Sequence, residues 1–257
     1  MQRIALTIIY NGLHHLKHKG YAEYMAKHLD WWVFVDGLAG NGGSTNWCKD
    51  LKGCQSDDGT IEYLKELQKT YPNIILQTND KGRKWRSKDD MVNKAIELLK
   101  TKTNDAFLWE IDCDEQWTDE IMMLSELTLL DQGAKTGTFH ANYYMGKDLL
   151  AYGMWGEGVG FPYRRLWNWK GEYFQKHEPP ELLRGNGKTV LLPYKFDHYS
   201  YYFEQDVLFK SRYYKGHELI HENWLKLNAG EIKTPCDLKT LFGHRRGVFQ
   251  NTIIRAA

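Results

Sequence analysis

The sequence predicts an α/β fold with a mostly parallel central sheet flanked by helices, followed by a smaller mixed C-terminal half. In the first half, short and nearly continuous apolar runs alternate with amphipathic helical patterns. This alternation is typical of βαβ units, whose strands are parallel. Strands buried on both faces carry continuous apolar runs, as these segments do. The second half differs, because Gly, Trp and Tyr are frequent there.

The expected strands of the first half are Ile4–Tyr10, Trp32–Val35, Ile74–Gln77 and Ala106–Ile111. The expected helices are Tyr21–Asp30, Thr60–Thr70 and a segment that begins at the capping box Ser87–Asp90. In the last of these, apolar residues recur at i, i+3, i+4 and i+7, which predicts one buried face. In the second half, Thr136–Tyr144 and Thr189–Leu192 are strand-like, and two helices are expected between Tyr202 and Leu227. No Pro- or Ser-rich linker separates the halves, so we expect one domain.

Composition excludes several classes of protein. The 34 Lys and Arg residues nearly balance the 33 Asp and Glu residues, and no basic run occurs, which argues against nucleic-acid binding. No apolar stretch approaches the ~20 residues of a transmembrane helix. The start, Met1–Tyr10, is interpreted as a first strand and not as a signal peptide. Cys48 and Cys54 share a loop and could pair, but the cysteine pattern favours a reducing cytoplasm.

Acidic residues follow the fourth expected strand directly. Asp112, Asp114 and Glu115 come after Phe107–Ile111, and on a continued strand Asp112 and Asp114 would point to the same side. Such carboxylates repel one another unless a cation or hydrogen-bond donors are present. The carboxyl end of a strand is also where open α/β sheets bind ligands. The pattern therefore indicates a site for Mg²⁺ or Mn²⁺ with a diphosphate. The alternative is a solvated acidic turn before a helix capped by Thr118 or Asp119.

Three segments in this order, Ile4–Tyr10, Val33–Gly37 and Leu108–Glu115, resemble glycosyltransferases of the GT-A fold, family 2 type. The similarity is clearest over residues 4–117 and continues more weakly through Arg164–Trp167, His177–Pro180 and Asp197–Tyr199. It implies a Rossmann-like, single catalytic domain. Residues 1–117 would form the nucleotide-sugar-binding half, 118–230 the acceptor-side half, and 231–257 a tail that could act as a lid. After Asp36, a longer Gly-rich loop replaces the short Asp-Gly-Ser turn of the family.

The resemblance also implies roles for individual residues. Asp36 would contact the base or ribose of the donor, Asp112 the ribose or the metal, and Asp114 the metal. Further candidates for donor contacts are Tyr10, Asn11, Arg83 and Arg86. His198 is placed like a third metal ligand, and imidazole suits Mn²⁺ better than Mg²⁺. It is equally well explained as a hydrogen-bonded histidine in an aromatic cluster.

The implied reaction moves a sugar from a nucleotide-diphosphate donor, expected to be a UDP-sugar, to a hydroxyl group of a carbohydrate or other acceptor, with inversion. Glu178, held before two prolines, could take the proton of that hydroxyl, and Glu157 is its rival. Trp167 and Trp169 share a face if that segment is extended, and could bind the acceptor sugar or belong to the core. The basic tail residues His244, Arg245 and Arg246 could cover the diphosphate or remain solvated.

Two other functions stay open at this point. His217-Glu218-Leu219-Ile220-His221 matches the H-E-x-x-H pattern, in which two histidines on one helix face bind zinc in a metallopeptidase. The residues that would complete the larger metzincin pattern are missing, and a chance match on an amphipathic helix is the simpler interpretation. The aromatic content alone would also fit a carbohydrate-binding module without catalytic activity.

Overall fold

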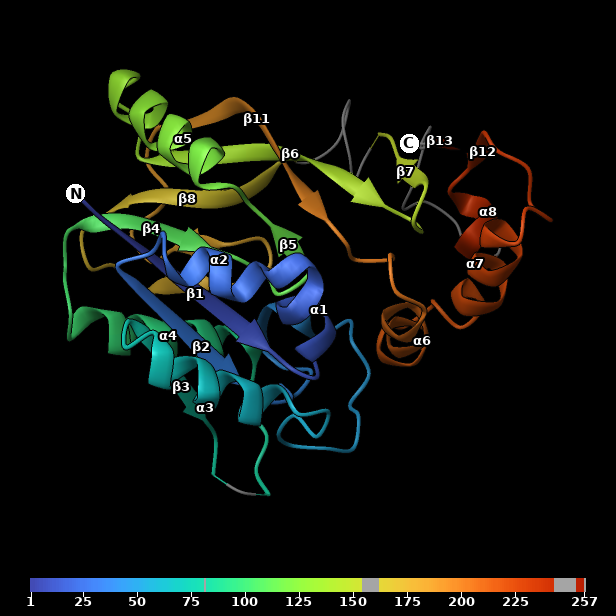
Figure 1. Cartoon of the computed structure of the whole chain (residues 1–257), viewed down its shortest axis with the longest axis horizontal. Helices are drawn as coiled ribbons and strands as arrows, with labels where there is room; N and C mark the ends of the chain where they lie inside the picture. Colours follow the sequence, from blue (N-terminus) through green and yellow to red (C-terminus); the bar gives the residue numbers. More distant parts are fainter. Residues whose placement is uncertain (81, 154–161, 243–252, 257) are drawn as a thin grey trace. The chain divides into compact units, whose positions relative to one another are not determined.

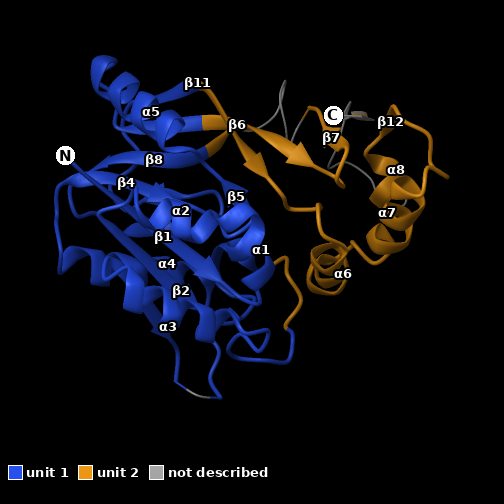
Figure 2. Cartoon of the chain, in the orientation of Figure 1, with its two compact units in different colours: residues 1–46, 51–138, 164–192 blue, residues 47–50, 139–163, 193–257 orange. Residues whose placement is uncertain are grey.

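The computed structural model describes residues 1–80, 82–153, 162–242 and 253–256 (Figure 1). The chain divides into two compact units (Figure 2). Unit 1 consists of residues 1–46, 51–138 and 164–192, and unit 2 of residues 47–50, 139–163 and 193–257. This division does not follow the expected boundary at 117/118, because residues 118–138 and 164–192 belong to unit 1. None of the four cysteines, all of which are described, forms a disulfide.

Unit 1 is built on a largely parallel sheet. Its strands β1 (Gln2–Ile9), β2 (Trp31–Asp36), β3 (Ile74–Thr78) and β4 (Ala106–Glu110) are parallel and lie in the order β3-β2-β1-β4. Strand β8 (Tyr163–Trp169) pairs with β4 in the antiparallel sense. The predicted class, α/β with a mostly parallel central sheet flanked by helices, is therefore confirmed.

Helices cover both faces of this sheet (Figure 1). On one face, the apolar stripe of α4 (Lys88–Lys100) packs on Ile4, Leu6, Val33 and Val35. On the other face, the Trp109 indole of β4 donates a 2.9 Å hydrogen bond to Glu126 of α5 (Asp119–Asp131). The remaining helices of unit 1 are α1 (Leu13–Lys17), α2 (Tyr21–Ala26) and α3 (Thr60–Thr70), with short 3-10 turns at His18–Gly20 and Gly43–Thr45.

Local signals in the sequence explain these elements. The Ser87 hydroxyl accepts a 3.2 Å bond from the Asp90 amide, which is the predicted cap of α4. The predicted stripe Val92, Ala95, Ile96 and Leu99 is fully buried. Because burial of an apolar side chain stabilises the folded state by roughly 1.5–3 kcal/mol, this stripe fixes α4 on the sheet.

Short strands complete unit 1, and two long strands continue into unit 2. The short ones are β5 (Glu115–Gln116), β9 (Phe174–Lys176) and β10 (Glu181–Leu182). Strands β6 (Thr136–Tyr144) and β11 (Thr189–His198) begin in unit 1 and end in unit 2. The other elements of unit 2 are β7 (Leu149–Ala151), α6 (Glu204–Tyr213), α7 (Ile220–Asn228), β12 (Cys236–Asp237), α8 (Lys239–Phe242) and β13 (Ile253–Ala256).

Unit 2 has its own apolar core, which includes Tyr143, Val207, Ile220, Trp224 and Leu241. The side chains come from β6, α6, α7 and α8, so these short elements bury their apolar faces against one another. Across the described residues, no helix combines the length and the hydropathy needed to cross a membrane.

Candidate functional site

The carboxyl ends of β1 and β4 form a topological switch point in unit 1. After β1, the chain adds β2 and β3 on one side of it, and then adds β4 on the other side. In open α/β sheets such a point is the usual ligand site, because the loops after the two adjacent strands diverge. Tyr10 and Asn11 follow β1 at this edge, and the acidic residues after Glu110 follow β4. The same edge carries Asp36 at the end of β2.

Asp36 is fully buried and already bonded. Its carboxylate accepts bonds from the hydroxyl and, at 3.2 Å, from the amide of Ser56. Burial raises the pKa of Asp36, although the bonds from Ser56 oppose the rise. The Ser56 hydroxyl in turn accepts the Asn11 amide at 2.7 Å. Ser56 therefore links Asp36 and Asn11, two of the residues expected to contact the donor. The buried carboxylate of Asp36 holds the loop that contains Ser56 and does not reach the surface.

The loop over residues 56–60 also satisfies the amides of the turn after β1. The Leu13 amide donates to Asp58 at 3.1 Å, and the Gly12 amide donates to the Thr60 hydroxyl at 3.1 Å. The Asn11 side-chain amide donates to Asp57 at 2.9 Å. Tyr10 lies half-buried above this loop, and burial followed by the charge of Asp57 raises the pKa of its phenol.

The acidic residues after β4 lie in a turn and not on a strand. The Glu115 amide donates to the Asp112 carbonyl at 3.0 Å, which closes a four-residue turn with Cys113 and Asp114 at its corner. The expectation that Asp112 and Asp114 point to one side because they alternate on a strand is therefore wrong. Thr118 caps the following helix by accepting the Ile121 amide at 3.2 Å, as one of the sequence alternatives proposed.

Arg165 neutralises part of this acidic turn. Its Nη2 donates to Asp112 Oδ2 and to Glu115 Oε1, each at 2.6 Å, and its Nε lies 2.8 Å from Glu115 Oε1. The Arg165 side chain is 6% exposed and that of Glu115 is 0% exposed. Burial raises the pKa of Glu115, and the contact with Arg165 counters the rise. This geometry fixes the carboxylate of Asp112, which is 30% exposed.

Glu110 supplies a second buried carboxylate beside this turn. It is 1% exposed, and its Oε2 has no hydrogen-bond donor among the described residues. His177 Nδ1 lies 2.8 Å from Glu110 Oε1. Burial alone would lower the pKa of His177, but the Glu110 carboxylate raises it. Glu110 and His177 thus form a close, buried pair of opposite charge when His177 is protonated.

Glu110, Asp112 and His177 together have the geometry of a cation site. One ligand atom of each lies within 4.8 Å of the others. Two carboxylates and one imidazole are donors that suit Mn²⁺ better than Mg²⁺. The buried Glu110 Oε2, which lacks a hydrogen-bond donor among the described residues, is the kind of group that a bound cation would satisfy. Asp112 belongs both to this set and to the one expected from the sequence.

The segment with His177 and Glu178 is held from its backbone. The His177 amide donates to Asp89 at 2.7 Å, and the Glu178 amide donates to the Ser44 hydroxyl at 3.2 Å. Ser44 also donates to Asp89 through its hydroxyl at 2.6 Å. Burial would raise the pKa of Asp89, but the bonds from Ser44 and His177 lower it. The Glu178 side chain is exposed.

Trp167 and Trp169 do not form an acceptor surface. Both indole side chains are fully buried in the core of unit 1, and their Nε1 atoms donate to Asn186 at 3.2 Å and to the Glu172 carbonyl at 2.7 Å. The expectation that they bind a sugar is wrong, because no face of either ring reaches the surface. Arg83 and Arg86 are both largely exposed, with side chains that pair with Asp80 and Asp90.

The remaining expected site residues are His198 in unit 2, Asp114 in unit 1, and Glu157 and the tail residues. His198 belongs to unit 2, where its ring lies 4.7 Å from that of Tyr143 and 5.4 Å from that of Tyr163. The aromatic surroundings expected for it are therefore present, and its role as a metal ligand stays a prediction. Asp114 lies at the corner of the acidic turn. Glu157 and the tail residues His244, Arg245 and Arg246 lie outside the described residues.

The H-E-x-x-H sequence does not lie on one helix. Helix α7 begins at Ile220, so His217 and Glu218 precede it. Glu218 pairs with Lys49 at 3.0 Å, and His221 contacts Glu204 at 3.1 Å. Because a zinc peptidase requires both histidines one turn apart on a helix, the structure removes the basis of that alternative.

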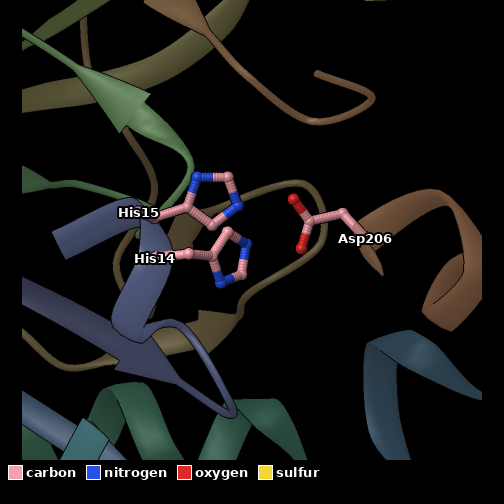
Figure 3. Close-up of side chains that lie close together, drawn as sticks. All are labelled: His14, His15 and Asp206. Carbon is pink, nitrogen blue, oxygen red and sulfur yellow. The ribbon is translucent and has the colours of Figure 1, made fainter. Parts of the chain in front are cut away.

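A second pair of histidines lies on α1. The rings of His14 and His15 are 4.2 Å apart, and Figure 3 draws them together with Asp206, a residue of α6 in unit 2. Within α1, His15 is buried and His14 is partly exposed.

Comparison with known proteins gives matches among solved structures alone. No protein-family model matches the sequence, and neither does any curated protein. The chain is similar to S. aureus TarS 1–349, with 10% identity and a TM-score of 0.47 over 91% of this chain and 75% of that chain. The same TarS fragment in complex with UDP-GlcNAc gives 11% identity and a TM-score of 0.47, over 91% and 76% of the two chains. A 4-diphosphocytidyl-2C-methyl-D-erythritol synthase gives 13% identity and a TM-score of 0.36, over 65% and 75%. At these values the similarity assigns neither a family nor an activity.

The sequence analysis missed Glu110, Arg165 and His177 as members of the site. Glu110 is the single charged residue inside an apolar strand, and that was the available signal. Arg165 and His177 come from a distant part of the chain, and only the pairing of β8 with β4 brings Arg165 to the acidic turn.

Proposed function

We propose that the chain is a glycosyltransferase that transfers a sugar from a nucleotide-diphosphate donor, a UDP-sugar, to a hydroxyl group of a carbohydrate or other acceptor. The observation that supports this most is the cluster of carboxylates at the β1/β4 switch point. It contains a buried Glu110 whose Oε2 has no hydrogen-bond donor among the described residues, next to an Asp112 whose position is fixed by Arg165. Carboxylates gathered at this edge of a sheet favour a metal-assisted diphosphate site over a purely structural one.

The proposal includes a divalent cation, Mn²⁺ or Mg²⁺. Glu110, Asp112 and His177 fit such an ion and would hold it, with Asp114 as a further candidate from the sequence. When bound, the ion would offset the negative charge that develops on the leaving diphosphate. Arg165 would keep Asp112 in place and limit repulsion among the carboxylates. The loop held by Asp36, through Ser56 and Asn11, would position the nucleoside.

Glu178 is the proposed general base. The acceptor oxygen would attack the anomeric carbon while its proton passes to the Glu178 carboxylate, and the bond from that carbon to the diphosphate oxygen would break. A single displacement of this kind inverts the configuration at the anomeric carbon. Glu178 is suited to the role because its side chain is exposed while its amide is held by Ser44, directly after the buried His177.

Titration calorimetry with UDP, with and without Mn²⁺, tests this proposal. We expect UDP to bind in a Mn²⁺-dependent manner. In Asp112→Asn the affinity for UDP should fall 10- to 100-fold, the loss that even a change beside a metal ligand usually causes. Asp105→Asn is the matched control, because Asp105 lies at the opposite end of β4 and pairs with the exposed Lys170. The proposal fails if UDP does not bind, or if it binds equally well in excess EDTA.

A further inference from the structure

Unit 2 contains a cavity of about 710 Å³ that the proposed transfer reaction does not use. It is lined by the turn between β6 and β7, the start of α6, the last turns of α7 and the segment after α7. All of its lining residues belong to unit 2. Ligand sites usually measure about 300–1,000 Å³ and combine apolar walls with a few polar groups, so this cavity has the size of such a site.

The floor of the cavity is apolar and held in place. Trp224 is 7% exposed, and its Nε1 donates a 2.8 Å bond to the Tyr201 carbonyl. Leu227 beside it is buried in the core of unit 2. Asn228 donates to the Met145 carbonyl at 3.3 Å, which ties the end of α7 to the turn after β6. Because Trp224 and Asn228 are already held by hydrogen bonds to backbone carbonyls, a ligand would meet a preformed floor.

The rim of the cavity is polar and balanced in charge. Lys147 and Lys233 contribute two positive charges, Asp148 and Glu204 contribute two negative ones, and all four residues are exposed. A site for phosphate or another polyanion would need an excess of positive charge, which this rim lacks. A ligand that carries several hydroxyl groups can hydrogen-bond to such a rim, whereas a purely apolar ligand cannot.

Two aromatic residues also line the cavity. Tyr202 and Phe203 are both partly exposed, and their ring centroids lie 4.8 Å apart in an edge-to-face arrangement. A sugar ring offers an apolar C–H face to such rings and hydroxyl groups to the surrounding charges. We propose that this cavity binds a neutral saccharide. Its C–H face would pack on the ring of Phe203, with the ring of Tyr202 perpendicular beside it, and its hydroxyls would donate to Asp148 and Glu204 and accept from Lys147.

This site does not rest on the proposed transfer reaction, and it is tested without UDP or metal. Saturation-transfer difference NMR on the full chain in EDTA would use maltose, cellobiose, lactose and chitobiose as probes. We expect transfer from the protein to ring protons of at least one disaccharide. The affinity for that disaccharide should fall at least 10-fold in Phe203→Ala, and Asp148→Asn should also weaken it.

Arg212→Ala serves as the matched control, since Arg212 is exposed on the same helix as Glu204 but does not line the cavity. It should bind the disaccharide as the unaltered chain does. Thermal unfolding followed by circular dichroism would identify variants that do not fold, and Asp148→Asn, at an exposed turn, keeps the test valid if Phe203→Ala unfolds. The proposal is overturned if no disaccharide gives transfer, or if both cavity variants bind as strongly as Arg212→Ala.

Discussion

The contact of Arg165 with the acidic turn leads to a quantitative prediction about stability. Arg165→Met removes contacts of 2.6–3.0 Å to Asp112 and Glu115 and leaves Glu115, which is 0% exposed, without its cation. Breaking a buried ion pair by removing one partner costs about 3–5 kcal/mol, because the remaining carboxylate either stays buried without its cation or takes up a proton, and burial already raises the pKa of Glu115 to about 8. Since each 1.4 kcal/mol is about a factor of ten, the folding equilibrium should fall by roughly 100-fold or more.

Urea unfolding followed by tryptophan fluorescence measures this effect. Lys170→Met is the matched control, because Lys170 and Asp105 form an exposed pair, with side chains 51% and 63% exposed. Such a pair contributes about 0–1 kcal/mol. The double variant Arg165→Met/Glu115→Leu should recover most of the lost stability, since neither buried charge remains at that position. If Arg165→Met is no less stable than Lys170→Met, the interpretation of this network as a buried, charge-compensated cluster is incorrect.

Three further predictions address the base, a surface ion pair and a helix cap. Glu178→Gln should keep the affinity for UDP but lower turnover by about 10²- to 10⁴-fold, and unimpaired turnover in a donor-consumption assay would move the role to another residue. Glu172→Gln should lower the free energy of unfolding by about 0.5–1 kcal/mol at pH 7, because Glu172 pairs with Lys135 at 2.6 Å. Burial would raise the pKa of Glu172, but the bond from Lys135 lowers it below the unfolded value of 4.5. The contribution of Glu172 to the free energy of unfolding is therefore fully present above pH 4.5 and is lost as the pH falls through the folded pKa. Urea unfolding at pH 7 and pH 3 checks this, and an equal difference at both would contradict it. Ser87→Ala should cost about 0.5–2 kcal/mol in the same assay through loss of the cap of α4, and an unchanged midpoint would count against that cap.

Elements with strong local signals were predicted closely from the sequence. Helix α3 covers Thr60–Thr70 as expected, and the cap at Ser87 starts α4 where the capping box placed it. The expected strand Thr136–Tyr144 matches β6. Helix α2 ends at Ala26, four residues before the expected end. Helix α1 was not predicted, because five residues are too few to show a helical period.

The site was predicted less completely, because it depends on contacts between distant segments. Strand alternation predicts that Trp167 and Trp169 share a face. The sequence does not show that this face is buried in the same core as the apolar side chains of α4. The approach of His177 to Glu110 results from backbone bonds to Ser44 and Asp89, and no local pattern encodes those bonds. The sheet edge could be predicted, whereas its particular partners could not.

The loop over residues 56–60 has a consequence for how tightly an anion can bind after β1. Asp58 already occupies the Leu13 amide, and it does so as part of the same chain. Because Asp58 is tethered to the same chain, its carboxylate faces this amide at an effective concentration in the millimolar range. Any anion added in solution would have to compete with Asp58 for that amide.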